Sequence, residues 1–496
     1  MKRASTHVKV DGRQPPVPQT RHSISSTDNA DFWRSTESPE RIVILGSGWA
    51  GYALGRKLNP RTCKSILISP RSHFVFTPLL ASTAVGTLEF RTAIEPVRRL
   101  GLAEFHQAWA SDIDFQRKVV RVEANTQGDV GAVTGVTLTK GTKTETEFEV
   151  PYDKLVLAVG CYSQTFGIEG VVEHACFLRD IGDARIIRLR VLGAFEKASL
   201  PTTSDDERAK LLHFAIVGGG PTGIEFAAEL HDLIRDDLAR LFPQLMPFVA
   251  ITIYDIAPKV LPMFDQNLAK YATDMFRRQG IRVKTEHQLE RIRREGDHLM
   301  LRIKEETAEV GAGVVVWSTG LMQNPLTGKL VGRDLTGIGR IAKDSRTGGF
   351  VTDQHMRVQV QLRGDSGDNG KTVTLPDVYA VGDCAAVQGR SYPATAQVAS
   401  QQAAYLAKQL NLDSGGRRHG EAKGRAAFTF RNLGSMAYLG SWRAIHQSSA
   451  DELKGRAAWI LWRTAYLTKS MSVRNKIMIP VYWFITWVFG RDISRF

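Results

Sequence analysis

The chain of 496 residues is too long for one small domain, and its 43% hydrophobic and 23% charged residues are ordinary for a globular protein with a sizeable core. Its four cysteines, Cys63, Cys161, Cys176 and Cys384, form no CxxC pair, which excludes a zinc ribbon, a thioredoxin-type dithiol and a disulfide-rich secreted scaffold. The net charge of +14 is concentrated in residues 1–27 and 453–496. A nucleic-acid enzyme more often spreads positive charge across a folded groove. We therefore expect the basic ends to bind an anionic surface, and we expect no nucleic acid as a partner.

Residues 1–40 show no apolar periodicity, and Pro15, Pro16 and Pro18 exclude a continuous helix there. We therefore predict a disordered lead. It has no apolar core of the secretory type, and its early Lys, Arg and Ser residues are compatible with a mitochondrial presequence. An ordinary loose terminus is the alternative.

The first ordered pattern begins at Arg41. Ile42–Leu45 is an apolar run typical of a buried parallel strand, and a glycine-rich turn, Gly46–Gly51, follows it directly. A helix to about Leu58 and a second strand over Lys64–Ser69 complete a βαβ unit. Further along, Leu155–Gly160 is a strand that ends in glycine.

The same order of elements returns at His213. Phe214–Val217 is a strand, Gly218–Gly223 is the turn, and a helix runs from Ile224 to about Leu241. The next strand, Ala250–Tyr254, is closed by Asp255. The chain therefore contains an internal repeat at the level of domains, and we predict an α/β fold with two tandem Rossmann-like dinucleotide-binding domains.

Both turns have the GxGxxG spacing. Its first glycine forms the tight turn, its second lets a pyrophosphate approach the backbone, and its third lets helix and strand pack closely. The helix N-terminus then offers unpaired N–H groups to the phosphates. Two matches in the correct context count against the alternative of two tight turns that bind nothing. We predict FAD at the first turn and NADH at the second.

Asp255 ends the strand after the second turn, where an acid can accept both ribose hydroxyls of NADH and repel the extra phosphate of NADPH. A plain strand-end turn residue is the alternative. The equivalent place in the first unit is Ser69-Pro70-Arg71, without an acid, and Arg71 is expected to face either the adenine or the phosphate end of FAD.

Three more segments complete the pattern up to residue 410. Val314–Gly320 and Val378–Asp383 are strands that end in glycine or Gly-Asp, and a long Ala-rich helix spans about Ala394–Leu410. Leu362–Thr374 is rich in Gly and Asp and indicates an exposed loop. We expect a lead (1–40), a discontinuous FAD domain (41–170 and 323–430), an NADH domain (171–322) and a carboxy-terminal membrane-anchoring or dimerisation segment (431–496).

The carboxy-terminal segment has no transmembrane span by sequence. Its longest apolar run, Ile477–Phe489, would reach roughly 20 Å as a helix, short of the roughly 30 Å hydrocarbon core. Upstream, aromatic residues alternate with Arg and Lys at helical spacing, which is typical of a helix lying in the membrane interface. A helical hairpin packed on the body or on a second subunit is the alternative, and both can hold at once.

On these motifs the sequence resembles the type II (alternative) NADH:quinone oxidoreductases, in particular their fungal mitochondrial branch. The resemblance runs from about Arg41 to the carboxy terminus. The segments that carry it are Gly46–Gly51, Ser69–Glu95, Leu157–Gly167, Val217–Leu230, Trp317–Gly320, Tyr379–Asp383, Pro393–Leu406 and Gly434–Ile445. It implies a flavoprotein with noncovalent FAD that passes two electrons from NADH to ubiquinone without pumping protons. It also implies a peripheral location on the mitochondrial inner membrane and a homodimer.

The resemblance assigns roles to individual residues. Asp383 would bind the ribityl chain of FAD, Thr77 would line the flavin, Glu225 would lie by the nicotinamide, and Gln397 and Gln401 would lie where isoalloxazine and quinone meet. From the residues alone, Asp383 is alternatively a helix cap, Glu225 a first-turn acid that complements the helix dipole, and the glutamines a polar stripe on an exposed helix. The full set expected to bind the two cofactors is Gly46, Gly48, Gly51, Ser69, Arg71, Thr77, Gly160, Gly382, Asp383, Gly218, Gly220, Gly223, Asp255 and Gly320.

Two departures and two alternative functions remain. Gln402 stands where the family motif AQxAxQE has Glu, which puts a proton-delivering role of that residue in doubt. The segment Asp365–Gly370 lacks the spacing of an EF-hand, with Pro376 where its last ligand should be, so we expect no calcium or other metal. The absence of a dithiol excludes a disulfide reductase. A sulfide:quinone oxidoreductase, which needs paired cysteines such as Cys161 and Cys384, and a redox-signalling flavoprotein are the alternatives.

Overall fold

The computed structural model describes residues 39–125, 147–362, 371–414, 426–448 and 451–495. The chain divides into two units, Met1–Pro39 and Glu40–Phe496, and the elements below belong to the second. The predicted lead up to residue 38, and residues 363–370 of the predicted loop with the rejected calcium segment, lie outside the described residues.

The first predicted βαβ unit is present. It consists of β1 (Glu40–Leu45), α1 (Trp49–Gly55) and β2 (Cys63–Ser69), and β1 pairs in parallel with β2 on one side and with β8 (Lys154–Leu157) on the other. The apolar residues of β1 are fully buried, as a strand with neighbours on both edges and layers on both faces requires.

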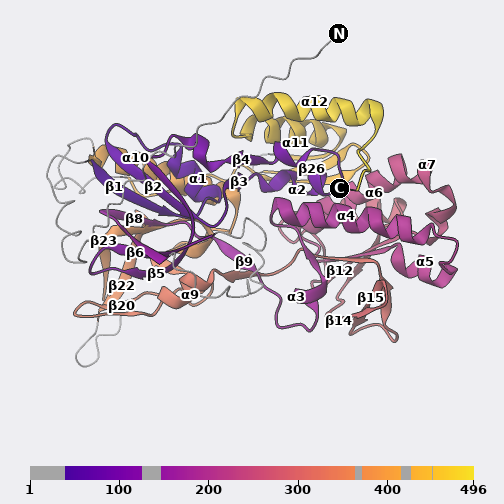
Figure 1. The fold of residues 1–496 in the computed structure, drawn as a ribbon, viewed down its shortest axis with the longest axis horizontal. Helices are drawn as coiled ribbons and strands as arrows, with labels where there is room; N and C mark the ends of the chain where they lie inside the picture. The colour runs from indigo at the N-terminus through magenta and orange to yellow at the C-terminus, as the bar shows by residue number, and fades with distance from the viewer. Residues whose placement is uncertain (1–38, 126–146, 363–370, 415–425, 449–450, 496) are drawn as a thin grey trace, which may run out of the picture. The chain divides into compact units, whose positions relative to one another are not determined.

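The sheet around β1 draws its strands from two distant parts of the chain. Its order is β19-β20-β22-β23-β8-β1-β2-β5-β6-β7, with β21 paired to β22 and β24 paired to β21. The further strands are β5 (Glu104–Asp114), β6 (Val119–Ala124), β7 (Glu147–Pro151), β19 (Asp334–Leu335), β20 (Gly339–Ile341), β21 (Phe350–Thr352), β22 (Arg357–Leu362), β23 (Thr372–Ala380) and β24 (Ala385–Val387). Helix α10 (Ala396–Ser414) packs against α1 beside this sheet (Figure 1).

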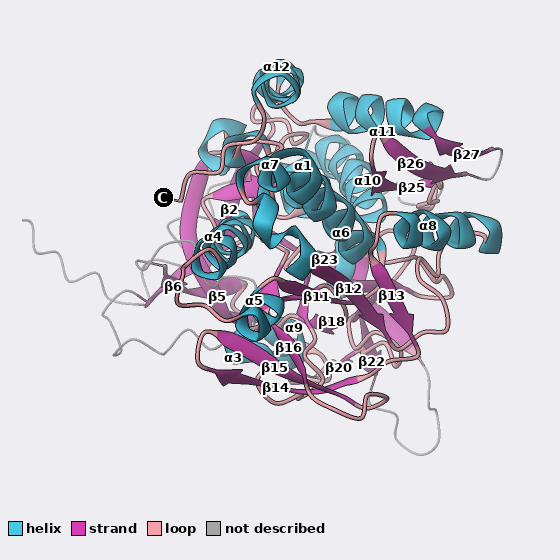
Figure 2. Ribbon diagram, turned by 90° about the vertical axis from the view of Figure 1, so that its right-hand side faces the viewer, coloured by secondary structure: helices cyan, strands magenta, loops and turns pink. Residues whose placement is uncertain are grey.

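The second predicted unit forms its own parallel sheet, with strand order β10-β17-β11-β12-β13. Its strands are β10 (Cys176–Phe177), β11 (His213–Val217), β12 (Ala250–Asp255), β13 (Arg282–Thr285) and β17 (Val314–Trp317), and its helices are α4 (Ile181–Ala198), α5 (Asp205–Leu211), α6 (Pro221–Leu233) and α8 (Gln266–Arg278). Helix α6 continues through a π-helical turn, Ile234–Leu238, into α7 (Ala239–Leu241), so the predicted helix to Leu241 is confirmed. An antiparallel sheet of β14 (Leu289–Glu295), β15 (His298–Ile303) and β16 (Val310–Ala312) lies beside it (Figure 2).

Short elements connect these layers. β9 (Cys161–Ser163) pairs antiparallel with β18 (Leu321–Gln323), so the two stretches that join the large sheet to the second sheet run side by side. The remaining short elements are β3 (His73–Val75), β4 (Ile94–Pro96), α2 (Leu80–Ala84), α3 (Val171–His174), α9 (Pro325–Leu330) and 3-10 turns at Thr77–Leu79, Phe90–Thr92, Val97–Leu100, Pro243–Phe248 and Gly382–Cys384.

The carboxy-terminal segment is a small sheet followed by two helices. The sheet consists of β25 (Ser435–Gly440), β26 (Arg443–Gln447) and β27 (Glu452–Gly455), and the helices are α11 (Arg456–Lys469) and α12 (Val473–Phe489), which contact each other (Figure 1). β25 packs on α6, so the segment is docked on the body of the protein. Within the described ranges, no helix is both long and apolar enough to cross a membrane. Phe484, Trp487 and Phe489 of α12 are nevertheless 60%, 66% and 80% exposed.

Candidate functional site

The first glycine turn has the geometry that a pyrophosphate needs. Gly46 has a φ of +105°, and a Cβ there would lie 2.3 Å from the carbonyl oxygen of Ala158. A Cβ on Gly51 would lie 1.9 Å from the carbonyl oxygen of Gly46, whereas a Cβ on Gly48 would meet nothing within 4 Å. The first and third glycines are thus required by the protein itself, and the second opens onto free space at the N-terminus of α1.

The second turn repeats this division. Gly218 has a φ of +114°, and a Cβ on Gly223 would lie 2.0 Å from the carbonyl oxygen of Gly218. A Cβ on Gly220 would again meet nothing within 4 Å. Both turns therefore leave the same backbone surface open to a ligand, in front of α1 and of α6.

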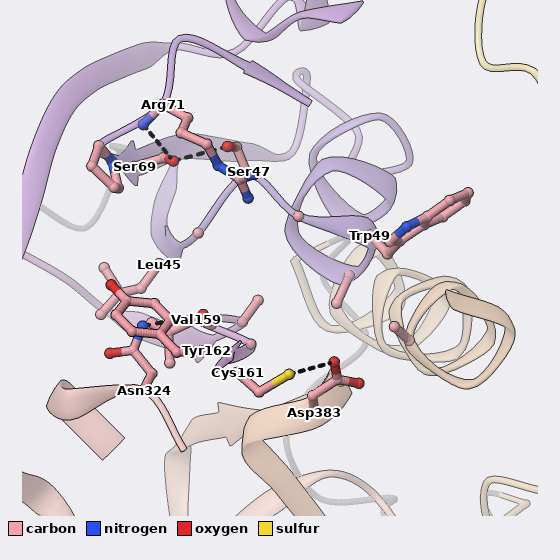
Figure 3. A pocket seen from close by; sticks show the side chains of 18 of the residues that line it. Leu45, Ser47, Trp49, Ser69, Arg71, Val159, Cys161, Tyr162, Asn324 and Asp383 are labelled. Atoms are coloured by element: carbon pink, nitrogen blue, oxygen red, sulfur yellow. Dashed lines mark hydrogen bonds between the residues drawn. The ribbon is translucent and has the colours of Figure 1, made fainter. Parts of the chain in front are cut away.

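A cavity surrounds the first turn (Figure 3). Its lining includes predicted residues from four separate segments, namely Gly46, Gly48, Ser69, Arg71, Thr77, Gly160, Gly382 and Asp383. Ala396 and Ala399, at the start of α10, close another side with small side chains. An elongated ligand with a phosphate-bearing end and a polyol fits this lining, since donors and glycines lie at the turn and a carboxylate lies across from it. The residues present therefore fit FAD.

Ser47, Ser69 and Arg71 form one wall of this cavity. The hydroxyls of Ser47 and Ser69 are hydrogen-bonded at 2.8 Å, and the backbone N–H of Arg71 donates to the Ser69 hydroxyl at 3.2 Å (Figure 3). The Arg71 guanidinium lies 2.9 Å from Asp180, where the chain enters the second domain. Burial alone would raise the pKa of Asp180, but the neighbouring His73 and Arg71 lower it to about 2. Arg71 thus both lines the cavity and joins the two domains.

Asp383 lies across the cavity from the turn. Its carboxylate accepts a hydrogen bond from the Cys161 thiol at 3.2 Å (Figure 3), and the 3-10 turn that contains it has no side-chain cap, so the structure does not support the alternative of a helix cap. Burial raises the pKa of Cys161 to about 11, so the thiol stays protonated and acts as a donor. The cysteines are free and buried, and Cys384 bonds backbone carbonyls instead of pairing with Cys161.

Arg179 is a cavity residue that the sequence motifs did not reveal. It donates to the Cys161 sulfur at 3.3 Å, and its Nη1 is buried without a hydrogen-bond partner among the described residues. An orphaned guanidinium nitrogen beside a cavity is available to an anionic or carbonyl group of a ligand. No spacing rule points to this position, because Arg179 reaches the cavity only where the chain leaves β10.

Gln402 has a structural partner. Its side chain is 2% exposed, and its amide oxygen accepts a hydrogen bond from the backbone N–H of Gly382 at 2.7 Å. An amide can hold the Gly382–Asp383 turn in this way without burying a charge. The side chain that replaces the family Glu therefore braces the turn that carries Asp383.

Gln397 and Gln401 bind backbone on the far side of α10. Gln397 donates to the carbonyl of Gly434 at 2.7 Å and accepts from the N–H of Leu433 at 3.1 Å. Gln401 exchanges both bonds with Arg431, at 2.9 and 3.0 Å. In this structure the two amides hold the irregular segment 431–434 that leads to β25, while Ala396 and Ala399 of the same helix line the cavity.

Asp255 contacts the second turn directly. It accepts hydrogen bonds from the backbone N–H groups of Gly219 and Ala257. The carboxylate therefore lies within the glycine turn. A Cβ on Gly219 would come within 2.9 Å of it. Gly320, with a φ of +75°, closes the neighbouring strand end, and a Cβ there would lie 2.7 Å from the carbonyl of Gln164.

Glu225 faces the carboxy-terminal segment. It lies beyond the first turn of α6, and it accepts hydrogen bonds from the N–H of Tyr438 at 3.1 Å and from the indole of Trp462 at 3.0 Å. Burial raises its pKa to about 8 despite these two donors. The alternative of a first-turn acid is therefore wrong.

The chain matches two protein-family models and several known proteins. A family model described as pyridine nucleotide-disulphide oxidoreductase matches residues 40–403, and one described as the NDH2 C-terminal domain matches residues 432–492. A probable NADH dehydrogenase of Dictyostelium discoideum is 39% identical over 92% of this chain and 91% of its own length. An internal alternative NAD(P)H-ubiquinone oxidoreductase A1, mitochondrial, of Solanum tuberosum is 35% identical over 95% and 91%.

Solved structures share the fold. NDH2 from Plasmodium falciparum in complex with NADH matches with a TM-score of 0.79 at 24% identity, over 92% of this chain and 100% of that one. The sulfide:quinone oxidoreductase of Aquifex aeolicus matches with a TM-score of 0.61 at 16% identity, over 91% and 96%. At these identities the likeness shows the two-domain architecture alone.

Proposed function

Because the chain belongs to the type II NADH dehydrogenase (NDH2) family, we propose that it is a non-proton-pumping NADH:quinone oxidoreductase that uses noncovalent FAD and passes two electrons to ubiquinone. The observation that carries this proposal is the pair of glycine turns, each open to a ligand at its second glycine and closed at its first and third. Bound FAD would supply the hydride-accepting and electron-donating chemistry that the chain's own side chains lack.

The residues of the cavity would position the bound cofactor and would not themselves take part in the redox chemistry. Gly48 lets the pyrophosphate approach the N-terminus of α1, and Asp383, aligned by Cys161, is placed to accept hydrogen bonds from a polyol. Asp255 and Gly220 would hold the ribose and phosphates of NADH at the second turn. Thr77, which accepts a hydrogen bond from the Trp49 indole at 3.1 Å, lines the same cavity.

For the quinone we retain Gln397 and Gln401 as the proposed contacts, with Glu225 by the nicotinamide. The amide N–H and C=O groups of both glutamines are hydrogen-bonded to the backbone. Binding a quinone carbonyl would therefore require one of these hydrogen bonds to be exchanged. Neutral amides suit this role because they leave no buried charge when the quinone departs.

We also propose a peripheral association with the mitochondrial inner membrane, through an anionic lipid surface, and a homodimer. The exposed aromatic residues of α12 and the basic carboxy-terminal segment support the surface association. The mitochondrial names of relatives such as the Solanum tuberosum protein support the compartment.

The sulfide:quinone alternative has no support from the cysteines. Cys161 bonds Asp383 and Cys384 bonds main-chain carbonyls, so neither is paired at the flavin cavity. The two-domain match to a sulfide:quinone oxidoreductase is a likeness of fold.

The deciding experiment follows the flavin absorbance of the purified protein. We expect NADH to bleach the flavin and a soluble ubiquinone analogue to restore its colour. Absence of bleaching would contradict the dehydrogenase function. Bleaching without reoxidation would remove the quinone half and favour a redox-signalling flavoprotein.

A further inference from the structure

A second cavity lies between α6 and the two carboxy-terminal helices. It encloses about 620 Å³ and shares no lining residue with the flavin cavity. The side chains that define it are Glu229 and Asp232 from α6, Trp459, Trp462 and Arg463 from α11, Trp483 and Trp487 from α12, and Arg491 beyond α12. The proposed electron transfer uses none of them.

Arg463 is the unusual residue of this cavity. Its guanidinium carbon lies 4.4 Å from the ring centre of Trp459 and 4.2 Å from that of Trp483, so one indole from each helix holds it by a cation–π contact. These contacts use none of its N–H donors. Among the described residues Arg463 forms no hydrogen bond or ion pair, and its Nε is buried without a partner. A fixed guanidinium with free donors is well suited to an oxyanion.

The acids of the cavity are already satisfied. Burial raises the pKa of Glu229 and so favours its neutral form, although the hydroxyls of Ser82 and Thr87 donate to it. The pairs around the cavity are Glu229 with Ser82 (2.6 Å) and Thr87 (2.8 Å), Asp232 with Tyr438 (2.6 Å), Asp236 with Arg235 (2.7 Å) and Asp237 with Arg491 (2.7 Å). Among the described basic residues that line the cavity, Arg463 and the exposed Arg240 form no ion pair, and of these two only Arg463 is partly buried.

One side of the cavity is apolar and exposed. Trp487, Val488 and Phe489 line it and are 66%, 47% and 80% exposed. They belong to the helix whose outer face carries Phe484 and Ile485, also exposed. A ligand for this place needs an anionic head for Arg463 and apolar chains for the outer face of α12.

We propose that this cavity binds one membrane phospholipid, with Arg463 donating hydrogen bonds to the phosphodiester and the acyl chains lying along the exposed apolar residues of α12. The proposal rests on the surface association proposed above and goes beyond it, because it assigns a stoichiometric lipid site to named residues. The cation–π contacts from both helices would let the bound lipid reinforce the contact of α11 with α12.

The test is a calorimetric titration of the full chain with dihexanoylphosphatidylglycerol, a soluble phospholipid, below its critical micelle concentration. We expect saturable binding at one site, weakened about tenfold or more by Arg463→Gln. Arg456→Gln is the matched control, because it removes the same charge from an exposed position of the same helix, and we expect its affinity within about twofold of the unmodified protein. Unchanged affinity in Arg463→Gln, or an equal loss in both variants, would overturn the proposal.

Control ligands and a second variant in the same titration identify the ligand. Glycerol 3-phosphate shares the phosphate but lacks chains, and octyl glucoside has a chain without an anion; either one binding as tightly as the phospholipid would overturn the lipid assignment. Arg463→Lys keeps the charge but loses the planar fork, and we expect intermediate affinity with an unchanged thermal melting curve. NADH oxidation with a soluble quinone analogue, assayed without lipid, should be unchanged in Arg463→Gln, so failure of the lipid site and failure of the proposed enzyme function are separable.

Discussion

At the scale of single residues, Asp255 has one structural and one proposed ligand-binding role, and substitutions can distinguish the two. Its carboxylate accepts a hydrogen bond from the backbone N–H of Gly219 within the turn. We propose that it also accepts hydrogen bonds from the ribose hydroxyls of NADH. We expect Asp255→Ala to raise the KM for NADH about tenfold or more, from the loss of charge-assisted hydrogen bonds, with a smaller change for NADPH. Initial rates with both nucleotides measure this.

Asp255→Asn is the control for the turn. It keeps an oxygen that can accept from Gly219, so its melting temperature should stay close to that of the unmodified protein while its preference for NADH weakens. If Asp255→Ala changes the KM values for NADH and NADPH equally, Asp255 does not bind the ribose and serves only to support the turn.

Glu225 predicts a pH dependence of stability. The ordinary carboxyl value is 4.5, and burial raises the pKa of Glu225 to about 8 in the folded protein. Between about pH 4.5 and 8 the folded protein retains a proton that the unfolded chain releases, so the free energy of unfolding falls as pH rises through this window. Glu225→Gln cannot ionise in this window, so its free energy of unfolding should fall less than that of the unmodified protein as pH rises. We expect the two losses to differ by on the order of a few kcal/mol by pH 8.5.

Urea unfolding at pH 5 and pH 8.5 measures this difference. The matched control is Glu196→Gln, at an exposed position of α4, whose pH profile should run parallel to that of the unmodified protein. Parallel profiles for Glu225→Gln and the unmodified protein would show that the carboxyl does not retain its proton on folding.

At the scale of elements, the two strand–turn–helix units predict different outcomes for chemically identical substitutions. Gly48 and Gly220 have φ values of −74°, which alanine adopts freely, and a methyl group at either meets only open space. We therefore expect Gly48→Ala to fold but to bind FAD more weakly, and Gly220→Ala to keep FAD and weaken NADH. Gly51→Ala would instead bring a methyl against the Gly46 carbonyl and destabilise the fold.

Flavin content, the KM for NADH and the melting temperature of the three variants distinguish these cases. A Gly48→Ala protein with full flavin affinity would show that the pyrophosphate does not lie over this turn. Loss of flavin from Gly220→Ala would contradict the assignment of the second unit to NADH.

At the scale of the whole molecule, the flavin cavity gathers residues from both halves of the large sheet and from the junction with the second domain. A ligand that binds only this assembled site stabilises the folded state. FAD at a thousandfold excess over its dissociation constant should add about 4 kcal/mol to the free energy of unfolding. We expect flavin-depleted protein to melt at a lower temperature and to recover on addition of FAD.

FMN provides the comparison for this effect, measured by thermal melting. It carries the flavin and ribityl chain but lacks the adenosine portion, so it should restore only part of the lost stability. Equal recovery with FMN would mean that the glycine turn and the wall of Ser69 and Arg71 contribute nothing to binding.

The sequence alone predicts both nucleotide-binding units, because strand, glycine turn and helix are adjacent in the chain. It also indicated the family and the basic, aromatic end, confirmed by the family matches and by helices α11 and α12. The partners of side chains that contact distant segments are known only from the three-dimensional structure. Arg179 and Arg71 meet the cavity at the domain junction, Gln402 braces the Gly382–Asp383 turn, and Arg463 lies between two helices. Local periodicity contains no information on such contacts, because they depend on how distant segments pack.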